Sequence, residues 1–238
     1  MNIKIVSDTV SFKLLLNDWK ILFSLSEHTI FQSFEFNYYS WEAELSNDLD
    51  NRLCITLLEK NNSKLAIFPF YIDSKNRLRF INDDHADFCD YVSEKSFDFE
   101  MVYDYLRFNI KFHSFRLTNL KRSSKIYNDI LCVNRLNMDV GLGAEYSMIS
   151  IDKGDFPYNV PHYRSHQKHR INKANRKYEK KTSLVLFHKA HPFPRKDLLY
   201  LRDLMISSGA RKYDFLTDNR LYLIESLYNS GFVIFHFL

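Results

Sequence analysis

The chain has 238 residues, of which 45% are hydrophobic and 16% aromatic, so it can bury one large core or two smaller ones. Its five glycines and five prolines are few, which argues against a disordered chain and against a loop-built β protein. The net charge of +4 is modest but uneven: eight Lys or Arg and one Glu lie between residues 164 and 181, so the rest of the chain carries a net −3.

Hydrophobic periodicity and capping residues predict a mixed order of helices and strands. Strands are expected at 2–6, 52–59, 64–72, 77–81, 112–117, 131–140, 148–151, 184–188 and 232–238. Helices are expected from Ser7 or Asp8 through Phe23, at 34–45, from Ser96 to 109, in the basic segment, at 196–207, and from Thr217 or Asp218 to Gly231. This order favours an α+β sandwich of the acyltransferase type over a doubly wound parallel sheet.

The segment 152–163 carries one glycine and two prolines and is typical of a linker. It divides the chain into a first domain, residues 1–151, and a second, residues 164–238.

Cysteine usage and hydropathy indicate a cytoplasmic protein without a membrane span. The three cysteines are odd in number and far apart, which is typical of reduced thiols. Cys54 and Cys132 lie in strand-like runs, so we expect both to be buried. Charged residues interrupt the N-terminal apolar run, so no signal peptide is expected. No stretch reaches the roughly 18 apolar residues that a bilayer crossing needs.

An acidic loop, Asn82 to Tyr91, follows the strand predicted at 77–81. In this loop, Asp87 or Asp90 could act as a general base or could bind a cationic amine. Alternatively, these side chains satisfy backbone N–H groups at a strand end. His85, Asp87 and Asp90 suit a divalent ion by residue type, but their spacing matches no known motif, so we expect no metal.

The basic segment 164–181 has a narrow apolar stripe, Ile171, Ala174 and Tyr178, which predicts a helix lying on a sheet. Its charges could simply be solvated. They also suit the phosphate groups of a small ligand. Nucleic acid is a less favoured partner, because only Tyr163 and Tyr178 interleave with the charges as stacking platforms.

Four segments in this order resemble one family: FQSFEFNYYSWEAE (31–44), KLAIFPFYI (64–72), LRFINDDHADFCDYV (78–92) and SHQKHRINKANRKYEKK (165–181). The chain resembles the BioF-like acetyltransferase domain proteins of the GNAT superfamily, to which the cellulose-biosynthesis CelD group belongs, with FemAB peptidyltransferases as distant relatives.

The resemblance implies two GNAT-like halves in tandem, the first complete and the second partial. It implies transfer of an acyl group from acetyl-CoA or another acyl-CoA to the nitrogen or oxygen of an amino sugar or polysaccharide precursor, without a metal. By position, the family's "DY" loop corresponds to Asp87, Asp90 and Tyr91. Cofactor phosphates would be bound by the basic residues Arg164, Lys168, Arg170 and Lys173.

Two alternatives remain. One is a non-catalytic GNAT-like binding module, or a fragment whose edge strand at 232–238 pairs with a partner chain. The weaker one is a nucleic-acid-binding protein, whose affinity would fall steeply with salt.

Overall fold

A computed structural model describes residues 1–61, 63–133, 141, 169–170, 172–173, 176, 187–189, 193–207, 216–232 and 235–237. The chain forms two compact units. One unit combines residues 1–138 with 193–233, and the other combines 139–192 with 234–238. The predicted linker at 152–163 lies outside the described residues, so the boundary stays a prediction.

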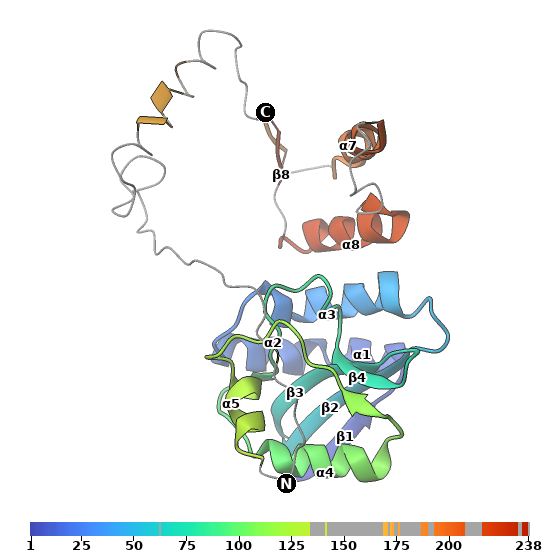
Figure 1. The fold of residues 1–238 in the computed structure, drawn as a ribbon, viewed down its shortest axis with the longest axis vertical. Coiled ribbons are helices and arrows are strands. Elements are labelled where there is room, and N and C mark those ends of the chain that lie inside the picture. The colour runs from blue at the N-terminus through green and yellow to red at the C-terminus, as the bar shows by residue number, and fades with distance from the viewer. Residues whose placement is uncertain are drawn as a thin grey trace. The chain divides into compact units, whose positions relative to one another are not determined.

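A twisted sheet is the centre of the larger unit (Figure 1). Its strands are β1 (Asn2–Val6), β2 (Arg52–Lys60), β3 (Ser63–Ile72), β4 (Arg77–Phe80), β5 (Val92–Ser93) and β6 (Ser114–Phe115). The order is β1-β2-β3-β4-β6 with β5 beside β3, and every pair is antiparallel except β4 with β6. Asn61, at the β2–β3 turn, has a φ of 51°, a left-handed conformation that Asn tolerates well.

The helices and strands confirm the predicted mixed α+β composition. The helical elements of the larger unit are α1 (Thr9–Leu14), α2 (Leu16–Leu25), η1 (Ile30–Gln32), α3 (Phe34–Ser40), the π-helical turn η2 (Trp41–Leu45), α4 (Phe99–Asn109), α5 (Lys125–Leu131), α7 (Arg195–Ser207) and α8 (Asp218–Asn229). As predicted, Asp8 caps α1 and Thr217 caps α8, each accepting a backbone hydrogen bond three residues on. Asp98, rather than the predicted Ser96, caps α4.

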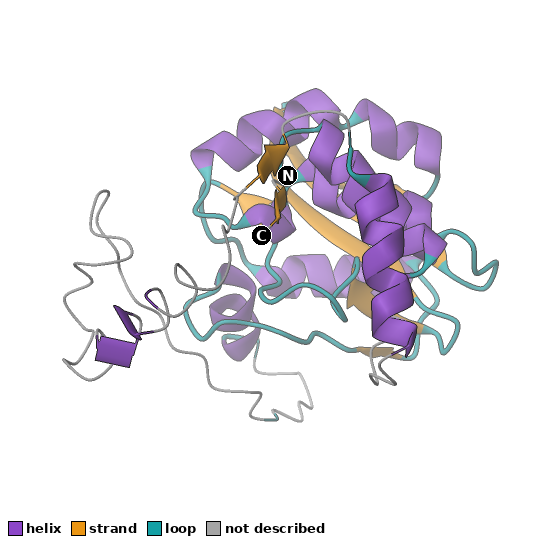
Figure 2. Ribbon diagram, turned by 90° about the horizontal axis from the view of Figure 1, so that it is seen from above, coloured by secondary structure: helices purple, strands orange, loops and turns teal. Residues whose placement is uncertain are grey.

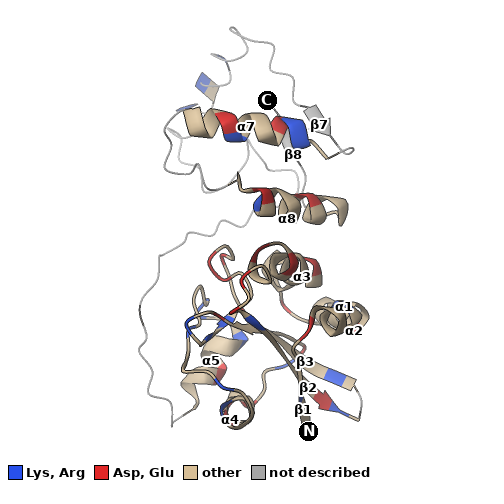
Figure 3. Cartoon of the chain, turned by 90° about the vertical axis from the view of Figure 1, so that its right-hand side faces the viewer, with Lys and Arg blue, Asp and Glu red and all other residues tan. Residues whose placement is uncertain are grey.

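The sheet is covered on both faces, which is why β2 is buried along its middle (Figure 3). Alternation sends Ile55 and Leu57 toward one face and Cys54 and Leu58 toward the other. The first face packs against α1, α2 and α3, where Trp19 is fully buried. The second packs against α4 and α5. Figure 2 shows the strands running beneath the helices.

Helix α8 belongs to the larger unit, although 54 residues of the other unit separate 138 from 193 in the chain. Leu221, Leu223 and Leu227 are buried on α8. Leu223 and Leu227 join the same apolar cluster as residues of β2, β3 and α4. Gly231, with a φ of 81°, follows the helix in the left-handed conformation, as the sequence predicts for a helix end.

The strand predicted from residue 131 is wrong at its start. Leu131 ends helix α5, and Cys132, expected to be buried, is its exposed C-cap. Ser124 caps α5, and Asp90 accepts hydrogen bonds from the backbone N–H groups of Lys125 and Ile126. Residues 134–140 and the strand predicted at 148–151 lie outside the described residues.

The smaller unit contains a two-stranded antiparallel sheet of β7 (Phe187–Lys189) and β8 (Phe235–Phe237). These strands lie within or beside the segments predicted at 184–188 and 232–238. Nothing further is assigned to their side chains.

Candidate active site

The acidic loop after β4 is tied to three separate elements. The side-chain amide of Asn82, whose φ is 55°, donates to Ser40 Oγ at 2.8 Å at the end of α3. Gln32 Nε2 donates to the carbonyl of Phe88 at 2.7 Å. Asn119 Nδ2 donates to the carbonyls of Asp83 and Ala86. The loop is therefore held in one conformation by the scaffold.

A buried ion pair forms the base of the loop. Arg79 on β4 binds Asp83 through two contacts, Nη2 to Oδ1 at 2.5 Å and Nε to Oδ2 at 3.2 Å. Asp83 is fully buried and Arg79 is 6% exposed. Thr118 Oγ1 also donates to Asp83 Oδ2 at 2.8 Å. Burial raises the pKa of Asp83, while the Thr118 hydroxyl and Arg79 act in the opposite direction.

The other side of the loop is open to solvent and carries three titratable side chains, Asp84, His85 and Asp87. Asp84 accepts a hydrogen bond from Arg79 Nη2 at 2.7 Å. Arg79 therefore links the buried Asp83 to the exposed Asp84, so the exposed carboxylate is also held in place.

His85 is influenced by the charges of an ion pair from two other elements. Arg220 on α8 approaches Glu44 on η2 with Nε 2.7 Å from Oε1. Partial burial, and then the positive charge of Arg220, lower the pKa of His85, while Glu44 and Asp84 act in the opposite direction. This direction favours the neutral imidazole, the form that accepts a proton.

The predicted residues Asp90 and Tyr91 have structural contacts. The Asp90 carboxylate accepts hydrogen bonds from three backbone N–H groups, those of Tyr91, Lys125 and Ile126, and burial raises its pKa. Tyr91 is 1% exposed, and its hydroxyl donates to Asp129 Oδ2 at 2.5 Å. Burial and Asp129 raise the pKa of Tyr91, so the phenol stays protonated. These two residues connect the loop to α5, whereas Asp87 faces solvent.

The surroundings of Cys89 disfavour a nucleophilic thiolate. Its thiol is buried, and burial together with the charges of Asp83 and Asp90 raises its pKa. A thiol held protonated reacts poorly with an acyl group.

Two of the four basic residues predicted to bind phosphate, Arg164 and Lys168, lie outside the described residues. Arg170 and Lys173 adopt a helical conformation and are exposed. Lys173 lines a hollow of about 350 Å³ with His169, Asn172 and Arg176. Within the described part of the chain, a small cationic surface thus borders a depression, and the predicted phosphate role stays a prediction.

Metal ligation finds no support in the acidic loop. Across the ranges that the structure describes, no three His, Cys, Asp or Glu side chains are grouped as a metal ion would require. No helix among the described residues combines the length and apolar character that a bilayer crossing needs.

Sequence reasoning missed Glu44, Thr118 and Arg220. Each comes from a segment distant from the loop, and none has a local pattern that marks it. Only the fold brings Glu44 and Arg220 to His85, because α8 returns to pack beside η2.

Comparison with known proteins adds no relative. No protein-family model matches the chain, and neither the curated proteins nor the solved structures contain a match.

Proposed function

We propose that this protein is a GNAT-type acyltransferase that moves an acyl group from acyl-CoA to the amine of an amino-sugar-like acceptor. The observation that carries the proposal is an exposed histidine, His85, on an anchored acidic loop, where the charges of Arg220 and Glu44 act on its pKa. The buried Arg79–Asp83 pair anchors the loop, and the exposed side of the loop carries polar side chains. This arrangement suits catalysis, because active sites are positioned by rigid scaffolds.

In this proposal His85 is the general base. An acceptor ammonium loses one proton to the imidazole, and the free amine attacks the thioester carbonyl. The new N–C bond forms as the C–S bond breaks, and the CoA thiolate leaves and takes the proton that the attacking nitrogen gives up; the protonated imidazole then returns its proton to solvent. The exposed carboxylates of Asp84 and Asp87 would attract the cationic amine, which favours an amine over a hydroxyl acceptor.

The acyl donor would be held by its phosphates. Arg164, Lys168, Arg170 and Lys173 are the proposed phosphate ligands, because Lys and Arg bind phosphate oxygens through charge-assisted hydrogen bonds. Positioning the thioester against the amine would supply most of the rate enhancement.

Release of CoA thiol, followed colorimetrically with acetyl-CoA and glucosamine or another amino sugar, tests this function. We expect His85→Asn to lower kcat/KM by about 10²–10⁴, as for loss of a general base. His113→Asn is the matched control, because His113 is also an exposed histidine. Equal activity of the His85 variant and the wild type would refute the assigned role.

A thermal-shift measurement with acetyl-CoA separates catalysis from binding. Stabilisation that rises with ligand concentration, together with thiol release, supports the acyltransferase. Stabilisation without thiol release for any amine would instead support the non-catalytic module. No stabilisation at about 1 mM acetyl-CoA would count against both.

A further inference from the structure

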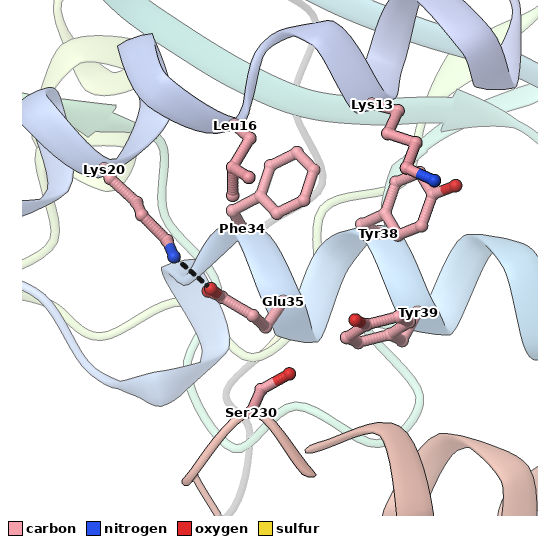
Figure 4. A pocket seen from close by; sticks show the side chains of 8 residues that line it. All are labelled: Lys13, Leu16, Lys20, Phe34, Glu35, Tyr38, Tyr39 and Ser230. Carbon is pink, nitrogen blue, oxygen red and sulfur yellow. Dashed lines mark ion pairs between the residues drawn. The ribbon is translucent and has the colours of Figure 1, made fainter.

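A second hollow, of about 280 Å³, lies on the larger unit between α1, α2, α3 and the residue that follows α8 (Figure 4). It is lined by Lys13, Leu16, Lys20, Phe34, Glu35, Tyr38, Tyr39 and Ser230. Its volume is near the lower end of about 300–1,000 Å³ typical of ligand sites, so it suits a molecule smaller than a nucleotide.

The helix faces around this hollow are mixed in character. Lys13, Leu16 and Lys20 follow an i, i+3, i+7 spacing, so they share one side of the α1–α2 segment. Opposite them, α3 presents two stacked rings, Phe34 and Tyr38, with centroids 5.3 Å apart. The lining combines these rings with two lysines and a glutamate (Figure 4).

Glu35 is the most informative residue of the hollow. Its side chain is only 10% exposed, and its Oε1 pairs with Lys20 Nζ at 2.9 Å. The other oxygen, Oε2, receives no hydrogen bond from any described residue. A carboxylate has about four acceptor positions, so a buried one with a single partner has capacity for a further donor.

The positively charged side of the hollow also has capacity for a further partner. Lys13 forms no ion pair with a described carboxylate, and it lines the hollow together with Tyr38 (Figure 4). With Lys13, Lys20 and Glu35 charged, the lining has a net charge of +1, so an anionic group would be attracted to the Lys13 end. The Ser230 hydroxyl lines the same hollow.

We propose that this hollow binds a free apolar amino acid as its zwitterion. The ammonium of the ligand would donate to Glu35 Oε2, and its carboxylate would pair with Lys13. Its side chain would lie against the aromatic rings that line the hollow, those of Phe34, Tyr38 and Tyr39. Burying each ligand charge against an opposite charge offsets the cost of its desolvation. The site is separate from the acidic loop and does not depend on acyl transfer.

Isothermal titration calorimetry of the full chain with L-phenylalanine tests this site. Two analogues isolate the charges: 3-phenylpropanoate lacks the ammonium, and phenethylamine lacks the carboxylate. We expect phenylalanine to bind about tenfold or more tightly than either analogue, because each analogue leaves a charged group of the site unpaired. L-leucine in place of phenylalanine should also bind.

Substitutions of Glu35 and Lys13 test the proposed contacts with the ligand. Glu35→Gln and Lys13→Met should each weaken phenylalanine binding by about tenfold or more. Lys60→Met is the matched control, because Lys60 is an exposed lysine at the end of β2 and does not line the hollow, so this variant should bind like the wild type. The proposal would be overturned if neither phenylalanine nor leucine gave heat at about 10 mM. It would also be overturned if the analogues lacking one charge bound as tightly as phenylalanine. Neither result requires a variant. Variants that fold and bind normally would overturn the assigned contacts and with them the proposal.

Discussion

At the scale of single residues, the buried pair Arg79–Asp83 fixes the acidic loop. Replacing Asp83 by Asn leaves the Arg79 guanidinium 6% exposed and without its main counter-charge. Loss of one partner from a buried ion pair costs about 3–5 kcal/mol, so the free energy of unfolding should fall by that amount in urea denaturation. Asp84→Asn is the control, since its side chain is 67% exposed and its loss should cost about 1 kcal/mol or less. Equal effects of the two variants would contradict this assignment.

The protonation of His85 gives a second prediction at this scale. Its folded pKa lies below the ordinary value of 6.5 because of burial and Arg220. The unfolded chain therefore binds more protons as the pH falls below 6.5, so the stability from this group is present above 6.5 and is lost as the pH falls toward the folded pKa. An NMR titration of the imidazole should give a midpoint below 6.5.

Substitutions of Arg220 and Glu44 test whether their charges shift the pKa of His85. Arg220→Gln should raise the midpoint, and Glu44→Gln should lower it, because the first removes a repelling charge and the second an attracting one. A midpoint that neither variant moves would leave burial as the whole cause and would remove Arg220 and Glu44 from the site.

At the scale of secondary-structure elements, α8 is part of the core that covers the sheet. Leu223 is 2% exposed in the same cluster as β2 and β3, so Leu223→Ala should lower the free energy of unfolding by about 2–5 kcal/mol. The two tryptophans, Trp19 and Trp41, both lie in the larger unit, so their fluorescence reports the unfolding of that unit.

The exposed residue Leu204 on α7 supplies the comparison. It is 46% exposed, so Leu204→Ala should change the stability by only about 0.5 kcal/mol. If Leu223→Ala left the tryptophan transition unchanged, α8 would unfold apart from the sheet and the shared core would be disproved.

Most of the element boundaries could be predicted because their signals are local. Continuous apolar runs define β2 and β3, and Asp8 and Thr217 begin their helices by accepting backbone hydrogen bonds within one turn. Helix α5 was not predicted: Ser124 is a local cap, but two of the first N–H groups are satisfied by Asp90, 35 and 36 positions earlier in the chain.

The candidate site was predicted only in part for the same reason. The acidic loop stands out by composition, so its position in the sequence could be found. The sequence could not show which of the loop's carboxylates is buried, because Asp83 and Asp84 are adjacent and have the same side chain. Arg79 and Thr118 select Asp83 for burial only after β4 and β6 have come together.

At the scale of the whole molecule, the chain leaves the larger unit near residue 138 and returns to it near 193. Trypsin has many cleavage sites between these two positions, and Arg170, Lys173 and Arg176 are exposed. Because 1–138 and 193–233 share one apolar core, cleavage within 164–181 should leave both fragments associated. Gel filtration with mass identification of the cut should show them eluting together in buffer and apart in concentrated urea. Fragments that separate in buffer would show that α8 is held by its connection alone, and the position of Arg220 beside His85 would then be lost on cleavage.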